Sequence, residues 1–174
     1  MEELIYNGCF ALASQECYNF ITNNPAVEFY SQAYTNDPRI IAQGYKPVAI
    51  NQCIELDLFG QICSESMGIR QYSGTGGQVD FTAGAQYNPD GKAFICLKST
   101  TTVNGEKISK IKPILSEGAT VSTLRTDVQY VVTEYGVAQL KGKSLSQRAK
   151  ELISIAHPDF RAELTADAKR LGIL

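Results

Sequence analysis

Three glycines stand close together in the segment 72–85, whose sequence is YSGTGGQVDFTAGA. Because glycine has no Cβ, Gly74, Gly76 and Gly77 can adopt backbone conformations closed to other residues, and a ligand can approach their peptide N–H groups. A helix that starts near Val79 would add unpaired N–H groups and the positive end of its dipole. This segment, whose residues 73–78 we call the glycine loop, therefore predicts a site for an anion or a carbonyl oxygen.

The glycine loop does not match the two common phosphate-binding motifs. A dinucleotide GxGxxG motif that starts at Gly74 needs glycine where Val79 stands, and a P-loop needs a Gly-Lys-Ser/Thr ending that is absent from this segment. Considered alone, the glycines also fit a tight structural turn. The loop is therefore neither a Rossmann nor a Walker motif.

Two further polar groups follow apolar runs. Lys98 and Ser99 come directly after 93–97, a continuous apolar run typical of a strand buried on both faces in a parallel sheet. Glu134 comes shortly after Val131 and Val132. In open α/β folds, ligands bind beyond the carboxyl ends of the strands. Lys98, Glu134 and the glycine loop are therefore expected in places where such folds bind ligands.

The composition is that of an ordinary globular chain. Its 174 residues are 44% hydrophobic and 20% charged, which suits one domain or a pair of small lobes. The formal net charge is -2 with both signs interspersed, so we expect neither nucleic acid nor a membrane as partner. No apolar run approaches the roughly 20 residues that cross a bilayer, and Glu2 and Glu3 do not fit a secretion signal. We expect a cytoplasmic protein.

The cysteines and the histidine argue against several kinds of site. Five cysteines without a CxxC pair suggest neither a disulfide framework nor a zinc cluster, and reduced, mostly buried thiols are expected. His157 is the only histidine, so a histidine-rich metal site is impossible and any Ser/His or Cys/His nucleophile would depend on this residue. A role at a helix end or in packing is the favoured interpretation of His157. We expect no bound metal.

Predicted helices and strands alternate along the chain. Helices are predicted over 10–21, from Pro38 after Asn36 and Asp37, from near Val79, over 144–155 with Ser144 as the cap, and over 159–171. Strands are predicted over 27–34, 48–50, 54–58, around 62, and over 93–97, 107–115, 121–124 and 128–132. This order predicts an α/β fold with a layered, mostly parallel sheet flanked by helices.

Two local patterns give more detailed expectations. The segment 54–58 alternates apolar with acidic residues, which predicts a strand with one solvated face. Arg148 and Arg161 lie on the two predicted helices at the end of the chain. We expect both arginines to be surface or salt-bridging residues outside any site.

Three longer motifs occur in order along the chain. They are SGTGGQVDF at 73–81, VVTEYGVA at 131–138, and Arg148 followed by HPDFR at 157–161. The segments 34–38 and 49–57 support them in the expected order. Together these motifs resemble the carboxyl-terminal half of the acetyl-CoA hydrolase/transferase family. The resemblance spans nearly the whole chain and implies that residues 1–174 form the C-terminal CoA-transferase domain of a longer two-domain enzyme.

The resemblance implies a class I CoA-transferase. Such an enzyme moves CoA between a short-chain acyl-CoA, here 4-hydroxybutyryl-CoA or butyryl-CoA, and a small carboxylate such as acetate. In this family a glutamate attacks the thioester, and acyl anhydride and glutamyl-CoA intermediates follow. That glutamate belongs to a segment upstream of this chain, so we expect the chain alone to be inactive and to need an N-terminal domain. The resemblance also implies a CoA thioester as substrate, no tightly bound cofactor, and a homodimer.

By similarity, the catalytic positions are Gly77, Asn36 and Glu134. The predicted CoA-binding positions lie on the glycine loop or at a strand end, and they are Ser73, Gly74, Gly76, Gly77, Gln78 and Lys98. Gly77 N–H and the Asn36 amide would donate to the oxyanion. Glu134 would orient the incoming acid or a water through a protonated or shared-proton contact. Lys98 would supply a positive charge for a phosphate or carboxylate.

Other interpretations stay open for these residues and for the whole chain. Asn36 fits helix capping, Asp80 fits a cap or a brace for the loop, Glu134 fits a solvated strand end, and Lys98 fits the surface. An acyl-CoA hydrolase differs from a transferase only in admitting water to the intermediate. A non-catalytic module that binds CoA or a nucleotide would use the same glycine loop.

Overall fold

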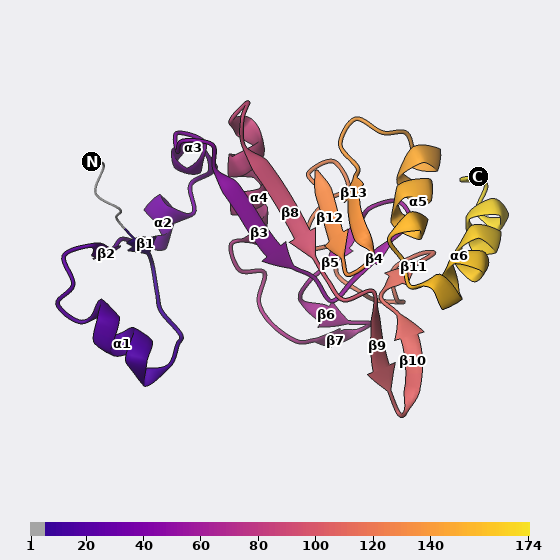
Figure 1. Ribbon diagram of the computed structural model, residues 1–174, viewed down its shortest axis with the longest axis horizontal. Coiled ribbons are helices and arrows are strands. Elements are labelled where there is room, and N and C mark those ends of the chain that lie inside the picture. Colours follow the sequence, from indigo (N-terminus) through magenta and orange to yellow (C-terminus); the bar gives the residue numbers. More distant parts are fainter. Residues whose placement is uncertain (1–5) are drawn as a thin grey trace.

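The computed structural model describes residues 6–174 (Figure 1). The helices are α1 (Gln15–Ile21), α2 (Gln32–Thr35), α3 (Pro38–Ile41), α4 (Gln78–Tyr87), α5 (Leu145–Ser154) and α6 (Pro158–Arg170). The strands are β1 (Tyr6–Gly8), β2 (Val27–Phe29), β3 (Val48–Gln52), β4 (Glu55–Asp57), β5 (Ile62–Cys63), β6 (Ser66–Met67), β7 (Arg70–Gln71), β8 (Lys92–Cys96), β9 (Thr100–Val103), β10 (Glu106–Ser109), β11 (Ile111–Lys112), β12 (Tyr130–Thr133) and β13 (Gly136–Gln139).

A four-stranded sheet in the order β13-β12-β8-β3 carries the candidate site. The apolar strand β8 pairs in parallel with β3 on one side and with β12 on the other, while β13 is an antiparallel edge strand. This arrangement confirms the predicted α/β fold with a mostly parallel sheet. It also brings the ends of β3, β8 and β12, and the polar residues that follow them, to the same edge of the sheet.

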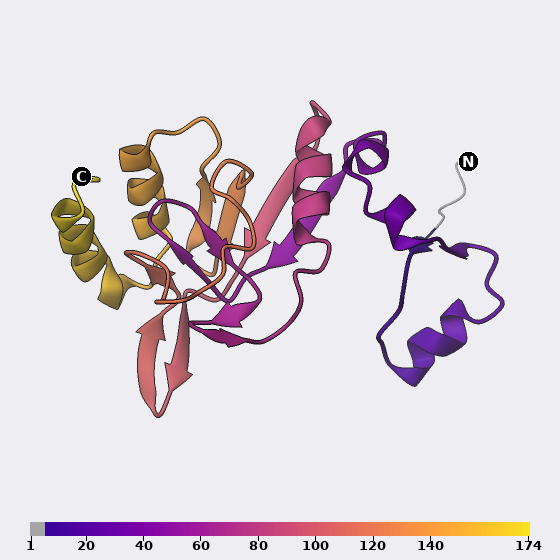
Figure 2. The ribbon, with the colours of Figure 1, turned by 180° about the vertical axis from the view of Figure 1, so that it is seen from behind.

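One face of this sheet is covered. Ala85 of α4 packs on Ala49 and Ala93, where small side chains let the helix lie close to the sheet. Further along, Ile95 and Val131 join a larger core with α5, α6 and the three-stranded sheet β11-β4-β5. Figure 2, the view from behind, shows α4 and β4 on this side. Burial is therefore concentrated on one side of the four-stranded sheet.

The two helices at the end of the chain follow their sequence signals closely. Ser144 Oγ accepts from Gln147 N–H while the Gln147 side chain accepts from Ser144 N–H, a reciprocal capping box that fixes the start of α5. His157 caps α6 by accepting from Asp159 N–H at 3.3 Å, and Pro158 occupies the first helical position. Of the two roles expected for His157, a helix end or packing, the structure shows the helix end.

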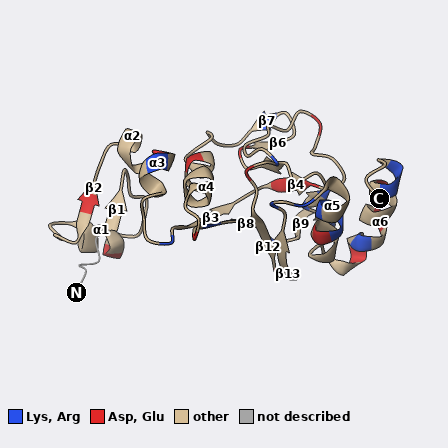
Figure 3. Ribbon diagram, turned by 90° about the horizontal axis from the view of Figure 1, so that it is seen from above, with Lys and Arg blue, Asp and Glu red and all other residues tan. Residues whose placement is uncertain are grey.

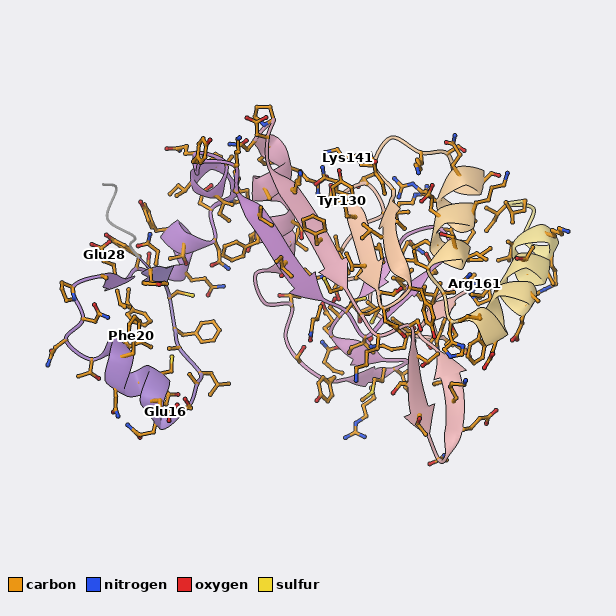
Figure 4. All side chains as sticks on the ribbon, viewed as in Figure 1. Glu16, Phe20, Glu28, Tyr130, Lys141 and Arg161 are labelled. Atoms are coloured by element: carbon orange, nitrogen blue, oxygen red, sulfur yellow. The ribbon has the colours of Figure 1, made fainter. Side chains whose placement is uncertain are left out.

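The start of the described chain differs from the prediction. α1 begins at Gln15 rather than at residue 10, because Ser14 caps it and Leu12 is 89% exposed, with no core to hold an earlier turn. The strand predicted over 27–34 ends at Phe29, because within residues 6–174 it pairs only with β1, along Val27 to Phe29, and α2 follows instead. Residues 6–48 contain no buried side chain. Figure 4 shows Phe20 and Glu28 in this segment, away from the sheet that carries Tyr130.

The predicted solvated face of segment 54–58 is wrong. Glu55 and Asp57 are both buried, because loops supply enough hydrogen-bond donors to replace water. Glu55 accepts from Ser116 N–H at 2.7 Å and pairs with Lys112 at 3.0 Å. Asp57 accepts from Phe59 N–H at 3.1 Å and from the Gln61 N–H and side chain. The alternation thus reflects a buried polar network rather than a surface.

Two further strand predictions need correction. The segment 107–115 is divided between β10 and β11, and β10 pairs with β9 across the turn Asn104-Gly105, whose φ values are +51° and +82°. Asparagine followed by glycine is a strong hairpin signal that the strand pattern alone did not use. The segment 121–124 forms only one bridge, between Thr123 and Ile62.

Arg148 and Arg161 are not the surface or salt-bridging residues that we expected. Arg148 is buried and donates to the carbonyls of Lys143 and Arg125, so it ties α5 to two loops. Arg161 donates to the Ala156 carbonyl, and its guanidinium lies 5.7 Å from the centre of the Tyr135 ring. Both arginines satisfy carbonyl groups, which the sequence does not reveal.

Candidate active site

Asn36 and Gly77, which are far apart in sequence, lie in direct contact. A Cβ built on Gly77 would collide with Asn36 Nδ2 and would lie 3.3 Å from Asn36 Cγ. Gly77 is the N-terminal cap residue of α4, whose first turn has free N–H groups. The structure therefore places an amide donor of one segment against the backbone of another.

The three glycines of the loop have different structural roles. Gly76 has φ +60°, a conformation that side chains disfavour. Gly77 has φ −97°, which any residue adopts, so the close approach of Asn36 is what requires glycine there. A Cβ on Gly74 would have no atom within 4 Å. Glycine is thus needed at 76 for backbone shape and at 77 for space.

The packing of α3 on α4 positions Asn36. A Cβ on Gly84 of α4 would lie 2.7 Å from Ile41 Cβ and 3.0 Å from the Pro38 carbonyl oxygen, so the two helices touch through this glycine. Asp37 caps α3 by accepting from Arg39 N–H at 2.9 Å. Since Asp37 performs the capping, Asn36 Nδ2 is free to face Gly77.

A cavity of about 640 Å³, which we call the glycine-loop cavity, opens beside Gly77. Its lining includes Asn36, Asn51, Gly76, Gly77 and Phe81. Within residues 6–174, no protein acceptor is hydrogen-bonded to the N–H groups of Gly76 or Gly77. These groups are therefore available to a ligand oxygen in the cavity.

A second, smaller cavity of about 290 Å³ lies where β3, β8 and β12 end, and we call it the edge cavity. Gln52, Cys96, Lys98, Val132 and Glu134 are among the residues that line it. Lys98 and Glu134 thus lie together at the carboxyl edge of the sheet.

The buried residue Ser99 holds Glu134 in place. Ser99 Oγ donates to Glu134 Oε1 at 2.6 Å, and Ser99 N–H donates to Oε2 at 2.9 Å. Burial acts to raise the pKa of Glu134, but the hydrogen bonds from Ser99 and the nearby His157 outweigh it and bring the pKa below its ordinary value. Glu134 is therefore a carboxylate at neutral pH, which argues against the protonated contact considered from the sequence.

Consecutive residues of β3 connect the two cavities. Asn51 lines the glycine-loop cavity and Gln52 lines the edge cavity, because neighbouring side chains of a strand point to opposite faces. Sequence reasoning used this segment only as a supporting motif and missed both residues. Two amides in succession at the end of a strand were the available signal.

The predicted CoA-binding residues do not form one cluster. Gly76, Gly77 and Gln78 line the glycine-loop cavity, whereas Lys98 lines the edge cavity. The Gln78 side chain is largely buried, and its Nε2 donates to Thr123 Oγ1 at 2.9 Å. Ser73 and Gly74 are exposed, and Ser73 Oγ donates to the Gly74 carbonyl at 3.0 Å. The loop thus leads from the surface to the cavity.

Metal ligands, cysteines and membrane-spanning helices were also considered as functional features of the sequence. Among residues 6–174, no group of three or more His, Cys, Asp or Glu side chains could hold a metal ion. All five cysteines are free, with Cys53 and Cys63 buried and the other three partly buried. No helix in this part of the chain has the length and apolar character needed to span a membrane.

Comparison with known proteins identifies the family of this chain. Residues 13–168 match the sequence profile described as "Acetyl-CoA hydrolase/transferase C-terminal domain". The probable butyrate:acetyl-CoA coenzyme A-transferase of Syntrophomonas wolfei is 52% identical over 94% of this chain and 37% of its own length. The 4-hydroxybutyrate coenzyme A transferase of Clostridium kluyveri is 50% identical over 92% and 37%. An acetyl-CoA hydrolase of Saccharomyces cerevisiae is more distant, at 33% identity over 78% and 25%.

The fold is also found in a solved structure. RipA from Yersinia pestis superposes with a TM-score of 0.90 and 40% sequence identity, over 98% of this chain and 38% of RipA. The chain thus spans less than two-fifths of the length of these relatives. It belongs to the acetyl-CoA hydrolase/transferase family, and its match lies in the C-terminal domain of that family.

Proposed function

We propose that the protein containing this chain transfers CoA between a short-chain acyl-CoA and a small carboxylate such as acetate. Two relatives that are about half identical bear the names of butyrate and 4-hydroxybutyrate CoA-transferases, and two others, at 51% and 50% identity, bear the names of succinyl-CoA transferases. We accordingly propose butyryl-CoA or 4-hydroxybutyryl-CoA as the acyl donor. Because the chain spans 37% of these relatives, the proposal concerns the longer protein, with residues 1–174 as its C-terminal domain.

One observation carries this proposal. Asn36 Nδ2 and the N–H groups of Gly76 and Gly77 lie beside one cavity at the start of α4. A thioester under attack places negative charge on its carbonyl oxygen, and fixed donors at that oxygen lower the barrier. The glycine-loop cavity supplies such donors from the backbone and from the side-chain amide of Asn36, which lies against Gly77.

The reaction divides between this domain and the rest of the protein. In the proposed mechanism a glutamate of the N-terminal part attacks the thioester carbon, so that a C–O bond forms, the C–S bond breaks and CoA leaves as a thiolate. The thiolate then attacks the glutamyl carbonyl of the anhydride and releases the first carboxylate. Acetate then attacks the glutamyl-CoA thioester and releases the thiolate. The thiolate attacks the acetyl carbonyl of the new anhydride, so that acetyl-CoA forms and the glutamate carboxylate is restored. The donors at Gly77 and Asn36 stabilise the oxyanion at each attack.

The edge cavity contributes charge. As a carboxylate, Glu134 accepts hydrogen bonds, so it would orient a water molecule or the acid form of the substrate. Lys98 lines the same cavity and would attract a carboxylate or a phosphate. The pair thus offers one acceptor and one cation near the end of β8. We assign CoA contact to Ser73, Gly74, Gly76, Gly77, Gln78 and Lys98.

An exchange assay of the full-length protein tests the proposal. We expect transfer of CoA from butyryl-CoA or 4-hydroxybutyryl-CoA to labelled acetate, followed by chromatography of the acyl-CoA products. The same assay without acetate measures hydrolysis, which we expect to be much slower. A complete lack of exchange with every short acyl-CoA would remove the proposal, and thioester loss that does not depend on acetate would indicate a hydrolase.

We also propose the cellular context that the family suggests. The protein would act in the cytoplasm as a homodimer, with CoA thioesters as substrates and no tightly bound cofactor. Light scattering of the purified full-length protein measures its mass in solution. A monomer at assay concentration would argue against the dimer without affecting the proposed chemistry.

A further inference from the structure

The second face of the four-stranded sheet is apolar and uncovered. Figure 1 looks onto this face, and no helix or loop of residues 6–174 crosses in front of it. The exposed fractions are 58% for Val48, 70% for Ile50 and 56% for Val137. Between them, Phe94 and Tyr130 stack with ring centres 5.1 Å apart. We call these five residues, together with Cys96 and Val132 in the same rows, the open face.

The strand register shows that the open face is continuous. Ile50 lies opposite Phe94, and Phe94 lies opposite Tyr130, so one row crosses three strands. The next row is formed by Gln52, Cys96, Val132 and Val137. Parallel strands usually have both faces covered, because exposing their apolar side chains to water is unfavourable. A continuous apolar surface of this kind marks an interaction site.

We infer that the open face docks the polypeptide that precedes this domain in the full-length protein. The chain matches a C-terminal domain and spans 37% of its relatives, so most of each relative's polypeptide lies outside this chain. A third row pairs Val48 with Lys92, and Lys92 is the only charged residue in the three rows. Charge on this face therefore does not favour a charged partner. Figure 3 shows β3, β8 and β12 as mostly uncharged ribbons.

Docking on this face has a consequence for the site. Cys96 and Val132 of the open face, and Gln52 in the same row, also line the edge cavity that contains Glu134. Polypeptide placed on the open face would therefore form the missing wall of that cavity. The docked part would face Glu134 directly, whereas the glycine-loop cavity lies on the other side of β3.

Cysteine labelling of the full-length protein tests this inference without an activity measurement. In separate variants, Ile50→Cys and Val137→Cys place thiols on the open face, and Ile69→Cys places one at a turn where the native side chain is 90% exposed. Alkylation is followed by peptide mass spectrometry, which separates these sites from the natural cysteines. Unfolded protein supplies the reference rate for each site.

The two open-face thiols should react at least roughly 10-fold more slowly in the native than in the unfolded protein, while the Ile69→Cys thiol reacts at nearly equal rates. Native rates equal to unfolded rates at both open-face positions would overturn the inference. The measurement is repeated after the protein has been diluted until it is monomeric in solution. Protection that disappears on dilution would assign the face to a second copy of the chain and would also overturn it. Neither result depends on whether CoA transfer is observed.

Discussion

A methyl group at position 77 tests whether the glycine loop and Asn36 act as one unit. The backbone of Gly77, at φ −97° and ψ 12°, accepts alanine without strain. The substitution Gly77→Ala therefore changes only the space available to the neighbouring side chains. The new Cβ would collide with Asn36 Nδ2 and would lie 3.2 Å from Phe81 Cε2. We expect the Asn36 amide to move away, because Phe81 limits any shift of the methyl group itself.

The size of the effect follows from the loss of one oxyanion donor. Such a loss costs about 3 to 4 kcal/mol, or roughly 10²- to 10³-fold in kcat. Asn36→Ala should cause a similar loss, because it removes the same donor directly. One donor can be lost only once, so the double variant should be about as slow as either single variant.

The measurement is kcat for CoA exchange by the full-length protein. Ile69→Ala is the control, because this side chain is 90% exposed and lines neither cavity, and we expect nearly full activity from it. Thermal melting of each variant checks that the fold is retained. The argument fails if the two losses multiply to roughly 10⁴-fold or more in the double variant, since independent effects multiply in this way. It also fails if Gly77→Ala alone remains fully active.

Three further predictions concern packing, titration and reactivity. Gly84→Ala would press on Ile41 and should lower the free energy of unfolding by about 1 to 3 kcal/mol in a denaturant melt, with a loss of exchange activity as Asn36 shifts. Ser99→Ala removes a hydrogen bond that lowers the pKa of Glu134, so the acid limb of the kcat/KM profile should move to higher pH; an unmoved limb would contradict this role. Burial raises the pKa of Cys53 to about 12, so iodoacetamide at pH 8 should leave this thiol unmodified until the protein is unfolded.

The sequence alone predicted those elements that a local signal determines. Ser144 and Gln147 formed the capping box that begins α5, and the apolar run around Ile95 became the central parallel strand β8. Such signals work because hydrogen bonds to neighbouring residues, or burial on both faces, leave few alternatives. The motif around the glycine loop likewise indicated the family.

Local pattern was misleading where distant partners decided the outcome. Glu55 and Asp57 alternate with apolar residues as on a solvated strand, yet both are buried because Ser116, Lys112 and Gln61 satisfy their oxygens. The donors to Glu55 come from residues far away in sequence, whereas those to Asp57 come from the loop that follows it. No short window contains the information that a charged side chain will find partners in the core.

The candidate site shows the same division. Residue types and motif order alone pointed to Asn36, Gly77 and Glu134. Only the tertiary structure showed that Asn36 touches Gly77, that Glu134 lies in a different cavity, and that Asn51 and its neighbour Gln52 connect the two. Contact between α3 and α4, and the alternation of side chains along β3, set these distances. Such geometry arises from packing between segments, and a linear pattern of residues does not contain it.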